Sequence, residues 1–232
     1  PHGIDLFQNK FIYIINHAFN YIKSVERIEV VEIIKDNNNK FKELKHIKSI
    51  ILPDNFFGTL NAITTVSQDT IYFTTANPFH MPNGEKENSF FYKIRYKLGN
   101  LITTVLNIKL CGMYQYHKGE IKLIKESKGI INNGIIYDDK NKLIYMAHTL
   151  PKQFSIYDVK EETKPILIKT IENEYAFDNL FMNKTSGIIY AGIIGSVFEF
   201  SQFFLLAKRS FVSDPLSTDD YFVTTLAALR LQ

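Results

Sequence analysis

The sequence predicts an all-β fold made of repeated hairpins, which is the arrangement found in a β-propeller. Three observations support this prediction: short strand-like segments, turn residues between them, and one hairpin pattern that occurs four times. The 232 residues are 45% hydrophobic, which suffices for one sizeable core. A β-sandwich with unrelated hairpins is the alternative fold.

The strand-like segments are short and rich in β-branched and aromatic residues. They include residues 11–15, 28–34, 71–75 and 143–147. Turn-forming residues separate such segments, at 36–39, 138–141 and 184–187. Helical periodicity is weak, and residues 84–108 form the segment best suited to a helical or irregular insertion.

The repeated pattern is a polar residue, a small or polar residue and an aliphatic residue, followed by a turn and a strand with tyrosine. Its four copies start at His2, Asn61, Asn133 and Asp178 and reach Tyr13, Tyr72, Tyr145 and Tyr190. The copies begin 59, 72 and 45 residues apart, which leaves room for two further strands in each unit. Four-stranded units with such a period describe propeller blades.

Polar residues at the start of each repeat would converge, because the innermost strand of every blade lines the central channel. The converging set is His2, Asn61, Asn133 and the pair Asp178-Asn179. Calcium takes about six to eight oxygen ligands, and amide and carboxylate oxygens suit it. Zinc would require Cys or several His, which this set lacks. A hydrogen-bonded polar plug filled with water is the alternative interpretation.

Several classes of function lack their signatures in this sequence. The net charge is +3, but Lys and Arg are scattered among Asp and Glu, so nucleic acid is not expected as a partner. No phosphate-binding loop, dinucleotide fingerprint or Gly-x-Ser-x-Gly elbow occurs. Cys111 is the single cysteine and is expected to be a buried bystander.

The compartment stays open at the level of the sequence. No apolar run reaches the ~18 residues that span a bilayer. The chain starts at Pro1 and shows no cleavable apolar region, so any targeting segment would lie upstream. The triplet Asn183-Lys184-Thr185 is a glycosylation sequon, which would make the protein a glycoprotein in a secretory setting.

Residues 1–195 resemble the paraoxonase/arylesterase family. The segment at 1–4 (Pro-His-Gly-Ile) is similar to the family's catalytic-histidine segment, and 15–17 (Ile-Asn-His) to its Val-Asn-His stretch. The segments 60–63 (Leu-Asn-Ala-Ile), 133–135 (Asn-Gly-Ile) and 177–180 (Phe-Asp-Asn-Leu) are similar to its Leu-Asn-Asp-Ile, Asn-Gly-Ile and Val-Asp-Asn-Ile turns. Val25-Glu26 and residues 44–50 extend the match in the same order.

The resemblance implies a six-bladed propeller with calcium in its tunnel and hydrolysis of small aryl esters or lactones. It implies that Asn61, Asn133, Asp178 and Asn179 are calcium ligands. It further implies that His2 is the general base that activates water and that His17 is its proton-relay partner. Association with a lipid surface, and a secreted or membrane-associated location, are expected from the resemblance only.

The chain departs from the family pattern at several positions. Ala62 replaces an aspartate that helps to hold a second, structural calcium, and 76–79 (Ala-Asn-Pro-Phe) lacks the family's histidine. About four of the six blades are expected here, so the propeller is expected to be incomplete. Residues 1–200 are expected to form the blades, and residues 201–232 resemble no part of the family pattern. A non-catalytic propeller that serves as a binding module, a truncated or degenerate member, and a strictosidine-synthase-like propeller therefore remain as alternatives to a calcium-dependent hydrolase.

Overall fold

The computed structural model describes residues 3–17, 26–53, 56, 58–78, 90–194 and 226–229, and four antiparallel sheets dominate it. The first sheet contains β1 (Ile4–Phe7), β2 (Phe11–Asn16), β3 (Arg27–Lys35) and β4 (Phe41–Ile51). The second contains β5 (Thr59–Ser67), β6 (Thr70–Asn77), β7 (Cys111–His117) and β8 (Glu120–Gly129). The third contains β9 (Ile131–Asp138), β10 (Leu143–Leu150), β11 (Gln153–Asp158) and β12 (Ile166–Glu172). The fourth contains β13 (Ala176–Asn183), β14 (Ile188–Ile194) and β15 (Leu226–Leu229).

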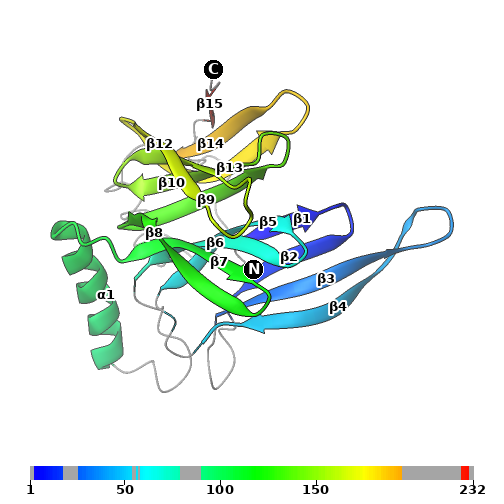
Figure 1. The fold of residues 1–232 in the computed structure, drawn as a ribbon. Helices are drawn as coiled ribbons and strands as arrows, with labels where there is room; N and C mark the ends of the chain where they lie inside the picture. The colour runs from blue at the N-terminus through cyan, green and yellow to red at the C-terminus, as the bar shows by residue number, and fades with distance from the viewer. Residues whose placement is uncertain are drawn as a thin grey trace, which may run out of the picture.

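In every sheet the strands pair in chain order, so each sheet is a simple meander. The sheets follow one another in a fan, from the blue N-terminal sheet to the orange sheet in Figure 1. The first strands of successive sheets lie side by side, because β1 contacts β5, β5 contacts β9, and β9 contacts β13. This arrangement is a partial β-propeller, as the sequence predicts.

The four repeats of the sequence form the first two strands of the four sheets. Side chains at the turns fix the hairpins: Asp36, Asp138 and Asn183 each accept two backbone N–H groups from residues shortly after them, at 2.8–3.2 Å. Gly187 completes one of these turns with a φ of 70°, a conformation that L side chains rarely adopt. The turns thus follow from the local sequence alone.

The sequence of residues 201–232 predicts no particular structure. From this region the structure describes β15, which pairs with β14 through Ile189 opposite Leu229 and Gly192 opposite Leu226. The division into residues 1–200 and 201–232 stays a prediction.

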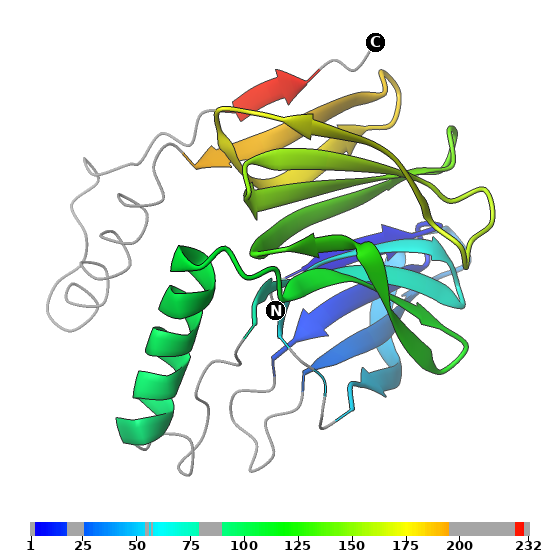
Figure 2. The ribbon, with the colours of Figure 1, turned by 60° about the vertical axis from the view of Figure 1, so that its left-hand side comes forward.

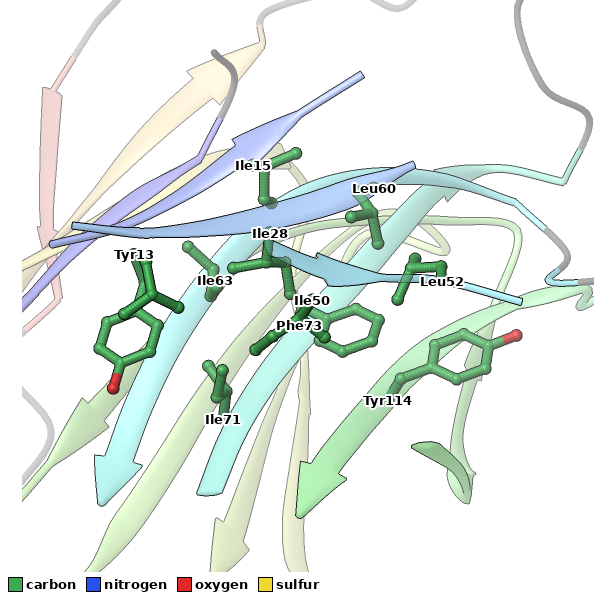
Figure 3. Packing of buried hydrophobic residues seen from close by; sticks show 11 residues of the cluster. Tyr13, Ile15, Ile28, Ile50, Leu52, Leu60, Ile63, Ile71, Phe73 and Tyr114 are labelled. Carbon is green, nitrogen blue, oxygen red and sulfur yellow. The ribbon is translucent and has the colours of Figure 1, made fainter. Parts of the chain in front are cut away.

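Apolar side chains fill the spaces between successive sheets, with one cluster in each space. Figure 3 shows the cluster between the first two sheets, where Ile15 and Ile28 meet Leu60, Ile63 and Phe73. The second cluster joins the second and third sheets, and the third joins the third and fourth. Three of the repeat tyrosines belong to these clusters: Tyr13 to the first, Tyr72 to the second and Tyr145 to the third. The hydroxyl of Tyr72 also donates to the carbonyl oxygen of Glu162 at 2.6 Å.

Helix α1 (Phe90–Val105) is inserted between β6 and β7 and stands outside the sheets (Figure 2). It lies within the 84–108 segment for which the sequence predicts a helical or irregular insertion. Ile94, Leu98, Leu101 and Val105 are exposed along it at helical spacing. No helix in the part of the chain described here is long and apolar enough to cross a membrane.

Candidate metal and catalytic site

The residues that begin the second, third and fourth repeats lie in β-bulges of the first strand of their sheets. Between the paired residues Leu60↔Thr75 and Ile63↔Phe73, two residues of β5, Asn61 and Ala62, oppose one residue of β6. A bulge of this kind bends the strand and redirects the side chains at the extra residue.

The same two-against-one bulge occurs in the next two sheets. Asn133 and Gly134 oppose Ala147, and Asp178 and Asn179 oppose Gly192. All four predicted metal ligands therefore occupy bulges, and the repeated polar lead of the sequence is the side-chain signature of a repeated backbone irregularity.

The bulges of neighbouring sheets are packed directly against one another. A β-carbon added to Gly134 would lie 2.6 Å from the Leu180 amide nitrogen and 2.7 Å from the Asp178 carbonyl oxygen. Likewise, a β-carbon on Gly3 would lie 2.7 Å from the carbonyl oxygen of Asn61. Glycine permits these approaches because it has no side chain. The segments that carry the predicted ligands thus lie side by side at the innermost strands.

Two of the predicted ligands carry buried oxygen atoms without a hydrogen-bond partner. The side chains of Asn61 and Asn133 are 5% and 8% exposed, and among the described residues neither Oδ1 atom has a partner. A buried acceptor left unpaired costs about 1–3 kcal/mol. Two such oxygens in neighbouring bulges fit a hard cation, which binds amide carbonyls.

The other two predicted ligands lie on β13, in the fourth sheet. Asp178 is half-buried and Asn179 is exposed. Asp178 is the one carboxylate among the four predicted ligands. Within the ranges that the structure describes, no three His, Cys, Asp or Glu side chains gather in a way that could hold a metal. Calcium binding by Asn61, Asn133, Asp178 and Asn179 therefore stays a prediction.

Ala62 follows Asn61 in the first of these bulges and faces apolar surroundings. Its methyl group belongs to the buried cluster with Val66, Met113 and Ile135, and its amide N–H donates to Thr74 Oγ1 at 3.2 Å. A methyl group offers no oxygen to a cation, so this position does not fit the acidic ligand that the resemblance implies there.

His17 lies just after β2, and its buried imidazole is hydrogen-bonded to Glu26, the residue before β3. The two carboxylate oxygens of Glu26 lie 2.8 and 3.0 Å from His17 Nδ1. A carboxylate accepts hydrogen bonds, so Nδ1 carries the proton and the ring orientation is fixed. Glu26 gives His17 an orienting partner that sequence reasoning did not assign. The sequence signal was the acidic residue in the Val25-Glu26 pair. His2, the predicted general base, lies outside the described residues.

A second histidine cluster has the order of a catalytic triad but lies in the interior. His148 Nε2 is 2.9 Å from Ser155 Oγ, and His148 Nδ1 is 2.7 Å from Asn132 Oδ1. Burial lowers the pKa of His148 to about 4, with a smaller effect from Lys109. Because His148 is 1% exposed and Ser155 is equally buried, this cluster is a hydrogen-bonded part of the core.

Cys111 is buried, as the sequence predicts, and burial raises the pKa of its thiol to about 12. A thiol with this pKa is not a nucleophile at neutral pH.

Successive antiparallel meanders, with polar bulges on the first strands of three of them, define a partial β-propeller. The sequence model of the arylesterase family matches residues 1–204, and the chain belongs to this family. It is 26% identical over 198 residues to human serum paraoxonase/arylesterase 2, covering 83% of this chain and 48% of that protein. It is 24% identical over 197 residues to human serum paraoxonase/lactonase 3, with the same coverage. The chain thus spans about half the length of the curated relatives it matches.

Proposed function

We propose that the protein is a calcium-dependent hydrolase of aryl esters or lactones. The observation that carries this proposal is the pair of buried oxygens, Asn61 Oδ1 and Asn133 Oδ1, in adjacent bulges of the innermost strands. Membership of the arylesterase family supports hydrolysis as the reaction class. Relatives named arylesterase and lactonase support the two substrate classes.

In this proposal Asn61, Asn133, Asp178 and Asn179 hold calcium through side-chain oxygens. Calcium, when bound, polarises the ester or lactone carbonyl and favours negative charge on its oxygen. The carboxylate of Asp178 supplies the one formal negative charge among these ligands, and the other three are neutral amides.

His2 and His17 handle the proton in the same proposal. His2 accepts a proton from water as general base, since a neutral imidazole offers a nitrogen lone pair to the proton. His17 passes the proton on, and Glu26 keeps its ring in one orientation by accepting from Nδ1. No serine nucleophile is needed, which agrees with the burial of Ser155.

The test is hydrolysis of phenyl acetate and of a simple lactone across a calcium titration, with a chelator as control. Asn133→Ala should abolish both calcium binding and turnover, whereas His2→Gln should lose turnover and keep binding. Thr64→Val serves as the control for general damage, because the buried Thr64 hydroxyl accepts a hydrogen bond from the Tyr137 amide and not from a predicted ligand. Equal calcium binding by the native protein and Asn133→Ala would sink the proposed site.

Calcium binding has a second readout that does not depend on turnover. A ligand at 100 times its Kd stabilises the folded state by about 2.7 kcal/mol. For a domain of this size that corresponds to about 5–11 °C in Tm. The native protein should gain this increment and Asn133→Ala should not.

A non-catalytic propeller that uses calcium as a structural staple is the second candidate. Ala62 favours it, because this position offers a methyl group where the family resemblance implies an acid. Calcium-dependent stabilisation without turnover on either substrate would select this alternative.

Association with a lipid surface is a further part of the proposal. The exposed apolar side chains of α1, Ile94, Leu98, Leu101 and Val105, support it. Sedimentation with phosphatidylcholine vesicles, compared between the native protein and Leu98→Glu, tests it, and equal sedimentation of the two would refute it.

A further inference from the structure

A buried threonine connects the bulge of the third sheet to that of the fourth. Thr149 lies on β10, and its hydroxyl donates to the carbonyl oxygen of Phe177 at 2.7 Å. Thr149 Oγ1 itself accepts a hydrogen bond from Asn133 Nδ2 at 3.3 Å. Phe177 immediately precedes Asp178, so one side chain contacts the bulge on β9 and the strand segment that enters the bulge on β13.

The direction of these two hydrogen bonds fixes the orientation of the Asn133 amide. A threonine hydroxyl has one hydrogen, and Thr149 uses it on the Phe177 carbonyl. Toward Asn133 the hydroxyl is therefore an acceptor, and it selects the amide nitrogen. The Asn133 Oδ1 atom must then point the other way, where it has no partner among the described residues.

A second threonine holds the backbone of the same asparagine. Thr74, on β6, donates to the Asn133 carbonyl oxygen at 2.6 Å and accepts the Ala62 amide N–H at 3.2 Å. The backbone of Asn133 is thus linked to the bulge of the second sheet, while its side chain is linked through Thr149 to Phe177, just before the bulge of the fourth sheet. Both threonines are buried, so neither bond competes with solvent.

We infer that Thr149 is a positioning residue for the cation site: it aims Asn133 Oδ1 and sets the approach to Asp178. This inference rests on the proposed function and adds to it the device that keeps two ligands on different sheets in one arrangement. Without the hydroxyl, the Asn133 amide can turn over, which would direct two N–H groups toward the cation. Residues that orient metal ligands typically change metal affinity by about 10- to 100-fold when they are replaced.

Thr64 offers a matched control for a purely structural role. It is a buried threonine on β5, and its Oγ1 accepts the Tyr137 amide N–H of β9 at 3.0 Å. Like Thr149 it connects two neighbouring sheets, but this bond involves none of the predicted ligands. Loss of a hydrogen bond between sheets should therefore lower the stability of Thr64→Val and Thr149→Val alike, whereas only the latter should change cation affinity.

The experiment is calcium titration calorimetry on the purified protein and four variants: Thr149→Val, Thr149→Ser, Thr64→Val and Asn133→Ala. We expect the Kd for calcium to rise at least about tenfold in Thr149→Val, to stay near native in Thr149→Ser and Thr64→Val, and to be unmeasurably weak in Asn133→Ala. Should Thr149→Val fail to fold, Thr149→Ala takes its place.

The outcomes distinguish the role of Thr149 from the existence of the cation site. Native affinity in Thr149→Val together with lost binding in Asn133→Ala would overturn the role of Thr149 and leave the site intact. Equal weakening in Thr149→Val and Thr64→Val would likewise reduce Thr149 to a structural contact. Native affinity in Asn133→Ala, or no saturable binding by the native protein, would overturn the site and the inference together.

Discussion

Replacing Gly134 by alanine tests whether the bulges of neighbouring sheets are as closely packed as the structure indicates. The new β-carbon would lie 2.6 Å from the Leu180 amide nitrogen and 2.7 Å from the Asp178 carbonyl oxygen. Ordinary contact begins near 3.4 Å, and both obstructing atoms belong to the backbone, so a side-chain rotation cannot relieve the overlap. The strands β9 and β13 must therefore separate by about 0.8 Å.

Overpacking of this kind costs about 1–3 kcal/mol. For a protein of 150–250 residues each kcal/mol lowers Tm by about 2–4 °C, so Gly134→Ala should melt about 2–12 °C below the native protein. Gly192 provides the control, because it opposes the Asp178-Asn179 bulge but has its nearest neighbour, Asp178 Cβ, at 3.5 Å. Gly192→Ala should melt near the native temperature.

Thermal unfolding followed by circular dichroism measures the difference, and urea midpoints at equal m-values check it. A Gly134→Ala protein that melts with the native protein would refute the close packing of the two bulges. Equal losses in Gly134→Ala and Gly192→Ala would show that any methyl group at these strands is harmful, and that the short distances at Gly134 have no special weight.

Three further predictions follow from buried groups. The pKa of His148 is about 4 in the folded protein and near 6.5 in the unfolded chain, so protons bind preferentially to the unfolded chain. The free energy of unfolding should therefore fall by about 3 kcal/mol between pH 6.5 and pH 4. Urea titrations should show a weaker pH dependence in His148→Gln, and equal slopes in the two proteins would contradict the prediction. Cys111 should not react with a thiol reagent at pH 8 until the protein is denatured, and rapid labelling of the native protein would contradict its burial. Phe73→Ala removes a fully buried ring that stacks on Tyr114 at 5.7 Å and should cost about 3–5 kcal/mol by urea denaturation, and a loss below 1 kcal/mol would mean that the first interface between sheets is loosely packed.

The sequence by itself determined the local structure and the repeated unit. The side chains of Asp36, Asp138 and Asn183 accept hydrogen bonds from backbone groups two to four residues away. These turns can therefore be predicted from the local sequence. Short runs of β-branched and aromatic residues set the strands, and the polar lead followed by a tyrosine identifies the first hairpin of each sheet. These features depend on interactions within about a dozen residues.

The tertiary structure alone decided how the predicted ligands are oriented and which residues support them. The bulges at Asn61, Asn133 and Asp178 depend on a strand register that no local pattern specifies. The bond from Thr149 to Phe177 spans 28 residues, and the one from Thr74 to Asn133 spans 59. Such contacts require the sheets to pack first, because burial between sheets is what removes water from these groups and makes each hydrogen-bond partner obligatory.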